Sequence, residues 1–155
     1  MSLLKGTILV TGSNGGLGSN IVSKIVNSPE FSQYYYGIYT VRTAESADVV
    51  KRILSSGPQT HQHDVVALDL GRLESVRQVA NDINRRVADG KLPPIRALIL
   101  NAGYQEHTTQ TFSPDGFDMS FQANYLSHWL LTLKLLQGLD AQRGRVVVVG
   151  SWTHE

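Results

Sequence analysis

The chain has 155 residues, a length that suits one domain and is too short for two ordinary ones. Apolar residues make up 41% of it and charged residues 17%, so the composition favours a packed core over a disordered chain. The formal charge of +1 excludes a basic field that would collect nucleic acid or an anionic membrane, and the lack of cysteine excludes disulfides, thiolate zinc sites and a cysteine nucleophile.

The first half of the chain alternates short β-rich runs with helical periods. Residues 7–11 predict a strand between two glycines, and the apolar spacing over residues 17–25 predicts a helix that stops at a Ser-Pro pair. Residues 35–41 predict a second strand, residues 46–55 a short helix, and residues 65–68 a third strand.

The second half continues the same alternation. A helix is predicted over residues 73–87 and a fourth strand over residues 97–100. Residues 113–137 predict a long helix, because this segment opens with a capping serine followed by a proline. Residues 146–149, four consecutive valines, predict a fifth strand.

The predicted strands are continuous apolar runs rather than alternating ones. Such runs are typical of strands that are covered on both faces, as in parallel sheets. Strand–helix–strand repetition then predicts an α/β, doubly wound sheet, a Rossmann-like fold, with residues 1–155 as a single domain. Ligands of such sheets bind beyond the carboxyl ends of the strands, so the residues that follow each strand are the candidate site.

A glycine-rich turn follows the first predicted strand. It reads Thr11-Gly12-Ser13-Asn14-Gly15-Gly16-Leu17-Gly18, with the spacing Gly-x-x-x-Gly-x-Gly. Glycines let the backbone approach a phosphate closely, and the helix that follows offers unpaired N–H groups and a positive dipole end. The turn therefore indicates phosphate binding, with a purely structural tight turn as the alternative.

Further motifs follow the other strands, and together they resemble the short-chain dehydrogenase/reductase family. These motifs are Asp69-Leu70, Asn101-Ala102-Gly103, Asn124 within the long helix, and Gly150-Ser151. The segments Asp115-Gly116-Phe117 and 124–131 resemble the retinol-dehydrogenase-like and protochlorophyllide-reductase-like branch. The resemblance implies an NAD(P)-dependent oxidoreductase with the strand order 3-2-1-4-5.

The resemblance also implies roles for individual residues. It places the pyrophosphate of NAD(P) on the glycine turn, the adenine on Asp69 and Leu70, and the ribose beside Ala102 and Gly103, and it implies that Asn101 stabilises the central strand. It implies that Asn124 holds a water of the proton relay and that Ser151 donates a hydrogen bond to the substrate oxygen. The cofactor-binding residues so implied are Thr11, Gly12, Ser13, Asn14, Gly16, Leu17, Gly18, Asp69, Leu70, Asn101, Ala102 and Gly103. For Asp69 a plain helix N-cap is the alternative.

The end of the second predicted strand indicates which cofactor is used. Proteins that bind NAD place a carboxylate there for the ribose 2′-hydroxyl, whereas this region reads Thr40-Val41-Arg42-Thr43, with no carboxylate before Glu45. A carboxylate would repel a 2′-phosphate, and a guanidinium can hold it with two hydrogen bonds. Arg42 therefore favours NADP over NAD, with an ordinary solvated arginine as the alternative.

The proton-transferring pair of the family is missing. Its chemistry uses a Tyr and a Lys four residues later, because a phenol of pKa near 10 needs cationic help to act as a base. None of the five lysines has a Tyr four positions before it. We therefore expect the N-terminal, cofactor-binding part of a longer catalytic domain, without its C-terminal strands and inactive alone.

Two other functions stay open. A non-catalytic nucleotide-binding module, as a pseudoenzyme or a split subunit, would also lack the Tyr–Lys pair. A methyltransferase that uses S-adenosylmethionine would follow its first strand with glycines, but Arg42 and the 101–103 triplet argue against it. The expected partners are a carbonyl or alcohol substrate and a second copy of the chain, paired through the fifth strand and the long helix, which would otherwise expose apolar surface.

Remaining features indicate no metal and no membrane. His61, His63 and Asp64 form a cluster that we expect in a solvated loop before the third strand rather than at a metal. His128 is expected to be a packing residue on the long helix. No apolar stretch approaches the length of a membrane helix, and the lack of cysteine fits a reducing, cytoplasmic location.

Overall fold

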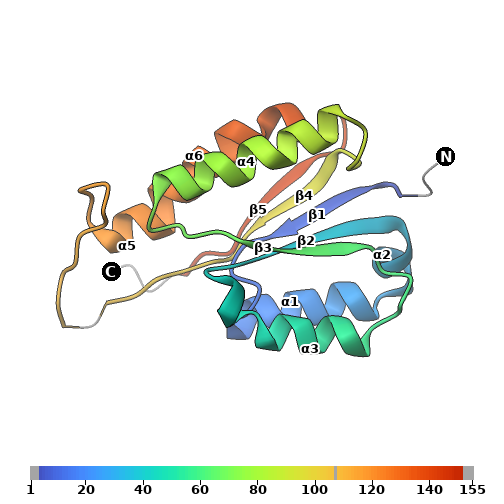
Figure 1. Ribbon diagram of the computed structural model, residues 1–155, viewed down its shortest axis with the longest axis horizontal. Coiled ribbons are helices and arrows are strands. Elements are labelled where there is room, and N and C mark those ends of the chain that lie inside the picture. Colours follow the sequence, from blue (N-terminus) through green and yellow to red (C-terminus); the bar gives the residue numbers. More distant parts are fainter. Residues whose placement is uncertain (1–3, 107, 152–155) are drawn as a thin grey trace.

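The computed structural model describes residues 4–106 and 108–151 as one α/β unit (Figure 1). Its strands are β1 (Gly6–Val10), β2 (Tyr35–Val41), β3 (His63–Ala67), β4 (Ile95–Leu100) and β5 (Arg145–Val148). Its α-helices are α1 (Gly16–Asn27), α2 (Pro29–Tyr34), α3 (Asp48–Ser56), α4 (Leu73–Ala88), α5 (Met119–Phe121) and α6 (Ser127–Leu135). The π-helical turn η2 (Gln122–Leu126) joins α5 to α6, and the 3₁₀ turns are η1 (Ala44–Ser46) and η3 (Leu136–Gly138).

The five strands form one parallel sheet in the order β3-β2-β1-β4-β5. The predicted fold class and strand order are therefore confirmed. Figure 1 shows α1 and α3 on one face of the sheet and α4 and α6 on the other. Because all strands run the same way, all their carboxyl ends reach the same edge of the sheet.

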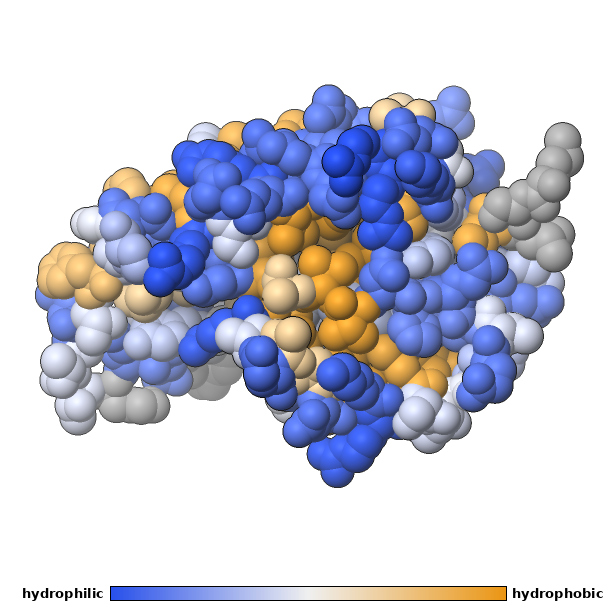
Figure 2. Space-filling view, viewed as in Figure 1, coloured by the Kyte–Doolittle hydropathy of each residue, from blue (hydrophilic) through white to orange (hydrophobic). Residues whose placement is uncertain are grey.

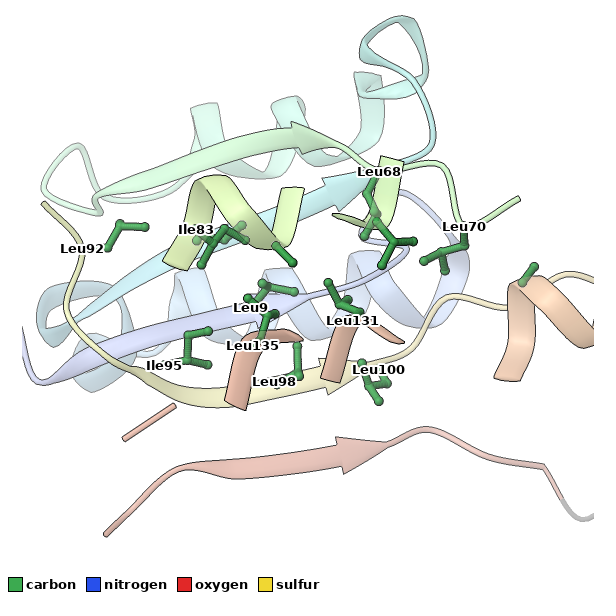
Figure 3. Packing of buried hydrophobic residues seen from close by; sticks show 14 residues of the cluster. Leu9, Leu68, Leu70, Ile83, Leu92, Ile95, Leu98, Leu100, Leu131 and Leu135 are labelled. Atoms are coloured by element: carbon green, nitrogen blue, oxygen red, sulfur yellow. The ribbon is translucent and has the colours of Figure 1, made fainter. Parts of the chain in front are cut away.

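Two apolar clusters hold these three layers together. One lies between the sheet and α4 with α6, and Figure 3 shows its side chains, including Leu9, Leu98 and Leu131, pointing toward one another. The other lies between the sheet and α1 with α3, around Val10, Val22 and Tyr39. Strand residues thus contribute to both clusters, which explains the continuous apolar runs: successive side chains point to opposite faces, and both faces are buried.

The two edge strands of the sheet, β3 and β5, are less buried than the central strand β1, whose residues are all buried. Figure 2, in the same view as Figure 1, shows apolar surface gathered between the two helical layers, in the region of β3. The residues of β3 are partly buried except for exposed Ala67, whereas all four residues of β5 are exposed. Of the two edges, the β5 edge is therefore the more open to another chain.

The long helix begins later than its capping serine predicts. The prediction of a start at Ser113 is wrong: residues 113–117 form a tight turn in which Gly116 has φ 85°, and α5 begins after Asp118, which accepts the Phe121 N–H. The Ser113 hydroxyl accepts from the N–H groups of Asp115 and Phe117, so it caps a turn rather than a helix. At its other end α6 stops at Leu135 and tightens into η3.

The Ser-Pro pair after α1 both ends one helix and begins another. Ser28 is the C-cap of α1 and also the N-cap of α2. Its hydroxyl accepts the Phe31 N–H, and Pro29 takes the first position of α2. Proline is favoured there because its missing N–H would have no partner in any case. The sequence does not predict the short α2, because a six-residue helix has too few apolar positions to show a period.

His61 is buried, so its predicted place in a solvated loop is wrong. The side chain is 5% exposed; its Nδ1 lies 3.1 Å from the Ser32 carbonyl oxygen and its Nε2 lies 2.9 Å from the Tyr39 hydroxyl. Because a carbonyl only accepts, Nδ1 carries the hydrogen and Nε2 accepts from Tyr39. Neighbouring Asp64 is paired with Arg86. Both side chains thus have partners within the protein.

We expect stability to fall as the pH drops from 6.5 to 5. Burial lowers the pKa of His61 and of His128 below the ordinary value of 6.5, so the unfolded chain takes up their protons first as the pH falls. Urea titrations should therefore show a free energy of unfolding that is flat above about pH 7.5 and lower by about 1 kcal/mol at pH 5. His61→Gln should reduce the loss of unfolding free energy at pH 5. If the loss is the same in His61→Gln as in the wild type, His61 does not contribute to it.

Candidate functional site

A cleft of about 730 Å³ opens at the carboxyl edge of the sheet. Segments that follow β1, β2, β3 and β4 line it, together with the start of α5. Of the predicted cofactor residues, the cleft brings together Gly12, Asn14, Gly16, Leu17, Gly18, Arg42, Asp69, Leu70, Asn101, Ala102 and Gly103. Their convergence follows from the parallel sheet, since residues far apart in sequence meet where the strands end.

The glycine turn needs its glycines for different reasons. Gly12 has φ 67°, a conformation that favours glycine, and a methyl group at Gly18 would lie 2.0 Å from the Gly12 carbonyl oxygen. Apart from its chain neighbours and the backbone of its own helix, nothing lies within 4 Å of the position that a Cβ of Gly16 would take. Gly12 and Gly18 are therefore required by the backbone itself, whereas Gly16 leaves open space at the mouth of α1.

The first turn of α1 is suited to an anion. No side chain caps the helix at Gly15, and no acidic residue stands in its first turn. The N–H groups of a helix's first turn have no partner within the helix, and they carry the positive end of its dipole. Leu17 is exposed beside them. An anionic group in the cleft would find both the donors and the space that Gly16 leaves.

Three predicted cofactor residues of this turn use their side chains inside the protein. Thr11 and Ser13 are fully buried; the Ser13 hydroxyl donates to the Val10 carbonyl oxygen, and the Thr11 hydroxyl accepts from the Asn101 and Ala102 N–H groups. Asn14 lines the cleft, but its Oδ1 accepts from two N–H groups in the first turn of α3, those of Val49 and Val50. These contacts hold the turn in shape, and a direct role in cofactor binding stays a prediction.

Arg42 stands at the end of β2, on the rim of the cleft. Its side chain is exposed, and its guanidinium carbon lies 5.9 Å from the centre of the Tyr104 ring. Among the residues that the structure describes, no carboxylate forms an ion pair with it. The cleft thus presents an arginine that is available to an anion on the side where the second strand ends.

Asp69 and Leu70 line the wall formed by the segment after β3. Asp69 Oδ1 accepts the Gly71 N–H at 2.9 Å, and its Oδ2 lies 3.6 Å from the Arg72 Nε. The alternative of Asp69 as an N-cap of α4 is wrong, because the Leu73 N–H donates instead to Asp115 Oδ2, 42 positions along the chain. Asp69 therefore lines the cleft with a carboxylate that Gly71 and Arg72 hold in place.

The segment after β4 is held from two sides. Asn101 Nδ2 donates to the Thr11 and Gly12 carbonyl oxygens, which fixes this segment against the glycine turn. Asn124, in the π-helical turn η2, accepts the Tyr104 N–H at 2.7 Å and donates to the Tyr104 carbonyl oxygen at 2.8 Å. Asn124 and Ser151 are exposed and do not line the cleft, so their predicted catalytic roles stay predictions.

Sequence reasoning missed several residues of the cleft. Arg72 and Tyr104 line it, as do Ser46 and Gly71. Tyr104 directly follows the 101–103 triplet and Arg72 comes three residues after Asp69, so both stand beside motifs of the family. Neither residue belongs to a motif with a spacing of its own, and only the fold shows that both side chains share the cleft with Arg42.

No metal or membrane feature accompanies the cleft. Over residues 4–106 and 108–151, no group of three His, Asp or Glu side chains could hold a metal ion. Within the same ranges, every helix is too short or too polar to cross a bilayer.

A glycine turn at a helix N-terminus, set at the carboxyl edge of a doubly wound parallel sheet, is typical of nucleotide-binding α/β proteins. Residues 6–154 match the family model described as short chain dehydrogenase, and the chain belongs to this family of oxidoreductases. The resemblance seen in the sequence is therefore confirmed.

Two curated relatives each cover nearly the whole chain, whereas the chain covers only part of them. It is 59% identical over 153 residues to the short-chain dehydrogenase iccH of Talaromyces variabilis, which spans 97% of this chain and 42% of that protein. It is 31% identical over 157 residues to protochlorophyllide reductase A of Arabidopsis thaliana, spanning 98% of this chain and 36% of that protein. The chain thus spans well under half the length of these curated relatives.

Solved structures share the fold. A metagenomic short-chain oxidoreductase in complex with NADP superposes with a TM-score of 0.72 at 22% identity, covering 97% of this chain and 64% of that one. RhlG of Pseudomonas aeruginosa, in an NADP active-site complex, superposes with a TM-score of 0.69 at 23% identity, covering 97% of this chain and 56% of that one.

Proposed function

We propose that this chain binds NADP(H) and forms the cofactor-binding part of an oxidoreductase that transfers a hydride between NADP(H) and a carbonyl or alcohol substrate. The observation that carries the proposal is the placement of Arg42 and the first turn of α1 on one cleft of about 730 Å³. That volume suits a cofactor, and the two features offer an arginine and helix N–H donors to two phosphate groups.

Each wall of the cleft has a part in this proposal. The N–H groups of Gly16, Leu17 and Gly18 would bind the pyrophosphate, and Arg42 the 2′-phosphate of the ribose. Asp69 would accept a hydrogen bond from the adenine amino group, and Leu70, Ala102 and Gly103 would line the space for the nucleoside. The bound cofactor supplies the hydride, and the protein supplies its position and excludes water. Beyond the cleft, Ser151 would orient the substrate oxygen and Asn124 a water.

We expect cofactor binding without turnover from these 155 residues. They contain no Tyr-x-x-x-Lys, so no phenol with a cationic neighbour four residues on is present to move the proton. Calorimetric titration with NADP⁺ should give a saturable heat, and NADPH oxidation with carbonyl substrates should stay at the background rate. Titration with S-adenosylmethionine is the control: saturable binding of that ligand and none of NADP⁺ would overturn the proposal in favour of a methyltransferase.

A non-catalytic nucleotide-binding module is the second candidate, and the missing Tyr–Lys pair favours it. The two candidates differ in what a longer product of the same gene does. Reductase activity that requires the longer product supports the oxidoreductase. If every product of the gene binds NADP⁺ and none reduces a carbonyl, the chain is a binding module.

We also propose that a second copy of the chain covers the apolar face of α6 and β5. On α6, Trp129 and Leu133 are exposed, Trp129 at 54%; Phe121 on preceding α5 is also exposed, and Val148 of the edge strand is 71% exposed. Exposed apolar surface of this kind is typical of an interface. Analytical ultracentrifugation should show a dimer that Trp129→Glu converts to monomer, whereas Phe31→Glu, at an exposed phenylalanine on α2, leaves it dimeric. A monomeric wild type would contradict the proposal.

A further inference from the structure

A buried imidazole–hydroxyl pair ties the end of β1 to helix α6. Thr11 is 0% exposed and His128 is 7% exposed, and the His128 Nε2 lies 3.0 Å from the Thr11 Oγ1 although 117 positions separate the two residues in sequence. The sequence predicts that His128 is a packing residue. In the structure it does more than pack, because both of its ring nitrogens have polar neighbours.

The neighbours of the ring determine which nitrogen carries the hydrogen. Nδ1 lies 3.4 Å from the Asn124 carbonyl oxygen, which can only accept, so Nδ1 is the donor and Nε2 the acceptor. The Thr11 hydroxyl must then donate to Nε2, which leaves its two lone pairs for the N–H groups of Asn101 and Ala102, each at 3.0 Å. Every hydrogen-bonding group of the Thr11 hydroxyl is used.

Three segments of the candidate site meet at this pair. Thr11 opens the glycine turn, its hydroxyl holds the first residues of the segment after β4, and His128 contacts the π-helical turn through Asn124. Asn101 adds a second connection by donating to the carbonyl oxygens of Thr11 and Gly12. A displacement of His128 would therefore shift both the glycine turn and the 101–103 turn, and residues of both, namely Gly12, Asn101 and Ala102, line the cleft.

We propose that His128 is a positioning residue of the cofactor site: by accepting the Thr11 hydroxyl hydrogen, its neutral imidazole orients that hydroxyl to hold the glycine turn and the 101–103 turn in the geometry that binds NADP(H). This inference rests on the proposed function. Its chemical requirement is an acceptor at the Nε2 position, which an imidazolium or a phenyl ring does not provide and a glutamine oxygen does.

The contribution of His128 to cofactor binding should be lost as the pH falls. A protonated Nε2 would point a hydrogen at a hydroxyl whose lone pairs already accept two N–H groups, so the pair would separate. The groups that face the ring are the Thr11 hydroxyl from the end of β1 and the Asn124 carbonyl oxygen from η2. Burial lowers the pKa of His128, and the hydrogen bond to the Asn124 carbonyl oxygen opposes that shift. Among the described residues, no charged side chain contributes to the pKa shift. Cofactor affinity should therefore weaken as the pH falls.

Calorimetric titration of the 155-residue chain with NADP⁺ tests the proposal. His128→Phe should bind NADP⁺ about tenfold more weakly than the wild type, and His128→Gln within about threefold of it. His61→Phe is the matched control, because it removes another buried neutral histidine away from the cleft: it should lower the melting temperature and leave the affinity unchanged. A folded His128→Phe variant with wild-type affinity would overturn the proposal.

Two further readouts keep the result decisive. The ratio of wild-type to His128→Gln affinity for NADP⁺ should fall as the pH is lowered from about 7.5 to about 5.5. Taking this ratio cancels the titration of the cofactor's own phosphate, because both proteins bind the same ligand. A constant ratio would count against the positioning role of His128, even if His128→Phe fails to fold.

In the free protein at pH 7.5, hydrogen exchange at the Asn101 and Ala102 amides should be faster in His128→Phe than in the wild type and unchanged in His128→Gln. If the wild type binds no NADP⁺, the proposed function fails, and amide exchange alone decides on His128.

Discussion

Replacing Gly18 with alanine is expected to abolish NADP(H) binding and to lower the free energy of unfolding by about 1–3 kcal/mol. The added methyl group would lie 2.0 Å from the Gly12 carbonyl oxygen, 2.7 Å from the Asn101 Nδ2 and 2.9 Å from the Gly12 carbonyl carbon. Two of these atoms belong to the backbone, so no side-chain rotation relieves the contact. The glycine turn must move away from α1, and the proposed pyrophosphate site moves with it.

Gly16→Ala is the matched control for this variant. The position is open, because no atom outside its chain neighbours and the backbone of its own helix lies within 4 Å of the new methyl group. The fold should therefore tolerate the change and gain about 0.4–1 kcal/mol from the reduced freedom of the unfolded chain. Its affinity for NADP⁺ should nevertheless fall, because the methyl group stands over the first turn of α1. Calorimetry and urea denaturation measure both effects. A Gly18→Ala variant with wild-type affinity and stability would show that the glycine turn is not packed against α1.

The strands and the site region could be predicted because their signals are local. A run such as residues 146–149 is apolar at every position, and apolar runs this short are typical of strands in a parallel sheet. Once the sheet is parallel, the residues after each strand must share one edge. This is why Gly12, Arg42 and Asn101, separated by dozens of positions, could be assigned to one cleft from the sequence.

The errors arise where a side chain finds its partner far along the chain. Asp115 accepts the N–H of Leu73 across 42 positions, so the start of α4 is capped from a loop that the local sequence does not show. His61 reads as polar and solvated, yet Tyr39 and the Ser32 carbonyl satisfy both of its nitrogens in the core. Capping and burial of polar groups depend on tertiary contacts, which single-sequence patterns do not contain.

Ser113 shows a different kind of error. A serine followed by proline has the residue types of a helix start, but Gly116 adopts φ 85° and turns the chain before a helix can form. The helix then starts behind Asp118, which is an equally good cap. Local preference alone does not decide whether Ser113 or Asp118 caps the helix. The hydrogen bond from the Ser113 hydroxyl to buried Gln122 favours Asp118, because this bond requires the turn over residues 113–117.

Arg42→Ala is expected to weaken NADP⁺ binding about 10- to 100-fold while the affinity for NAD⁺ changes by less than about twofold. The two cofactors differ only in the 2′-phosphate, so a residue that binds this group affects one ligand and not the other. Arg42 lies on the cleft rim with no ion pair among residues 4–106 and 108–151, so its removal leaves no buried charge behind. Arg42→Glu should go further and favour NAD⁺, because a carboxylate repels the phosphate and can accept from a ribose hydroxyl.

Arg52→Ala provides the control, since Arg52 is an exposed arginine on neighbouring α3 that does not line the cleft. Its loss changes the net charge by the same amount and should leave both affinities as they are. Added salt should weaken NADP⁺ binding to the wild type more than to Arg42→Ala, because the exposed guanidinium–phosphate contact is screened. An equal loss of NADP⁺ and NAD⁺ affinity in Arg42→Ala would mean that Arg42 supports the cleft, through the Tyr104 ring that lies 5.9 Å from it, rather than binding the 2′-phosphate.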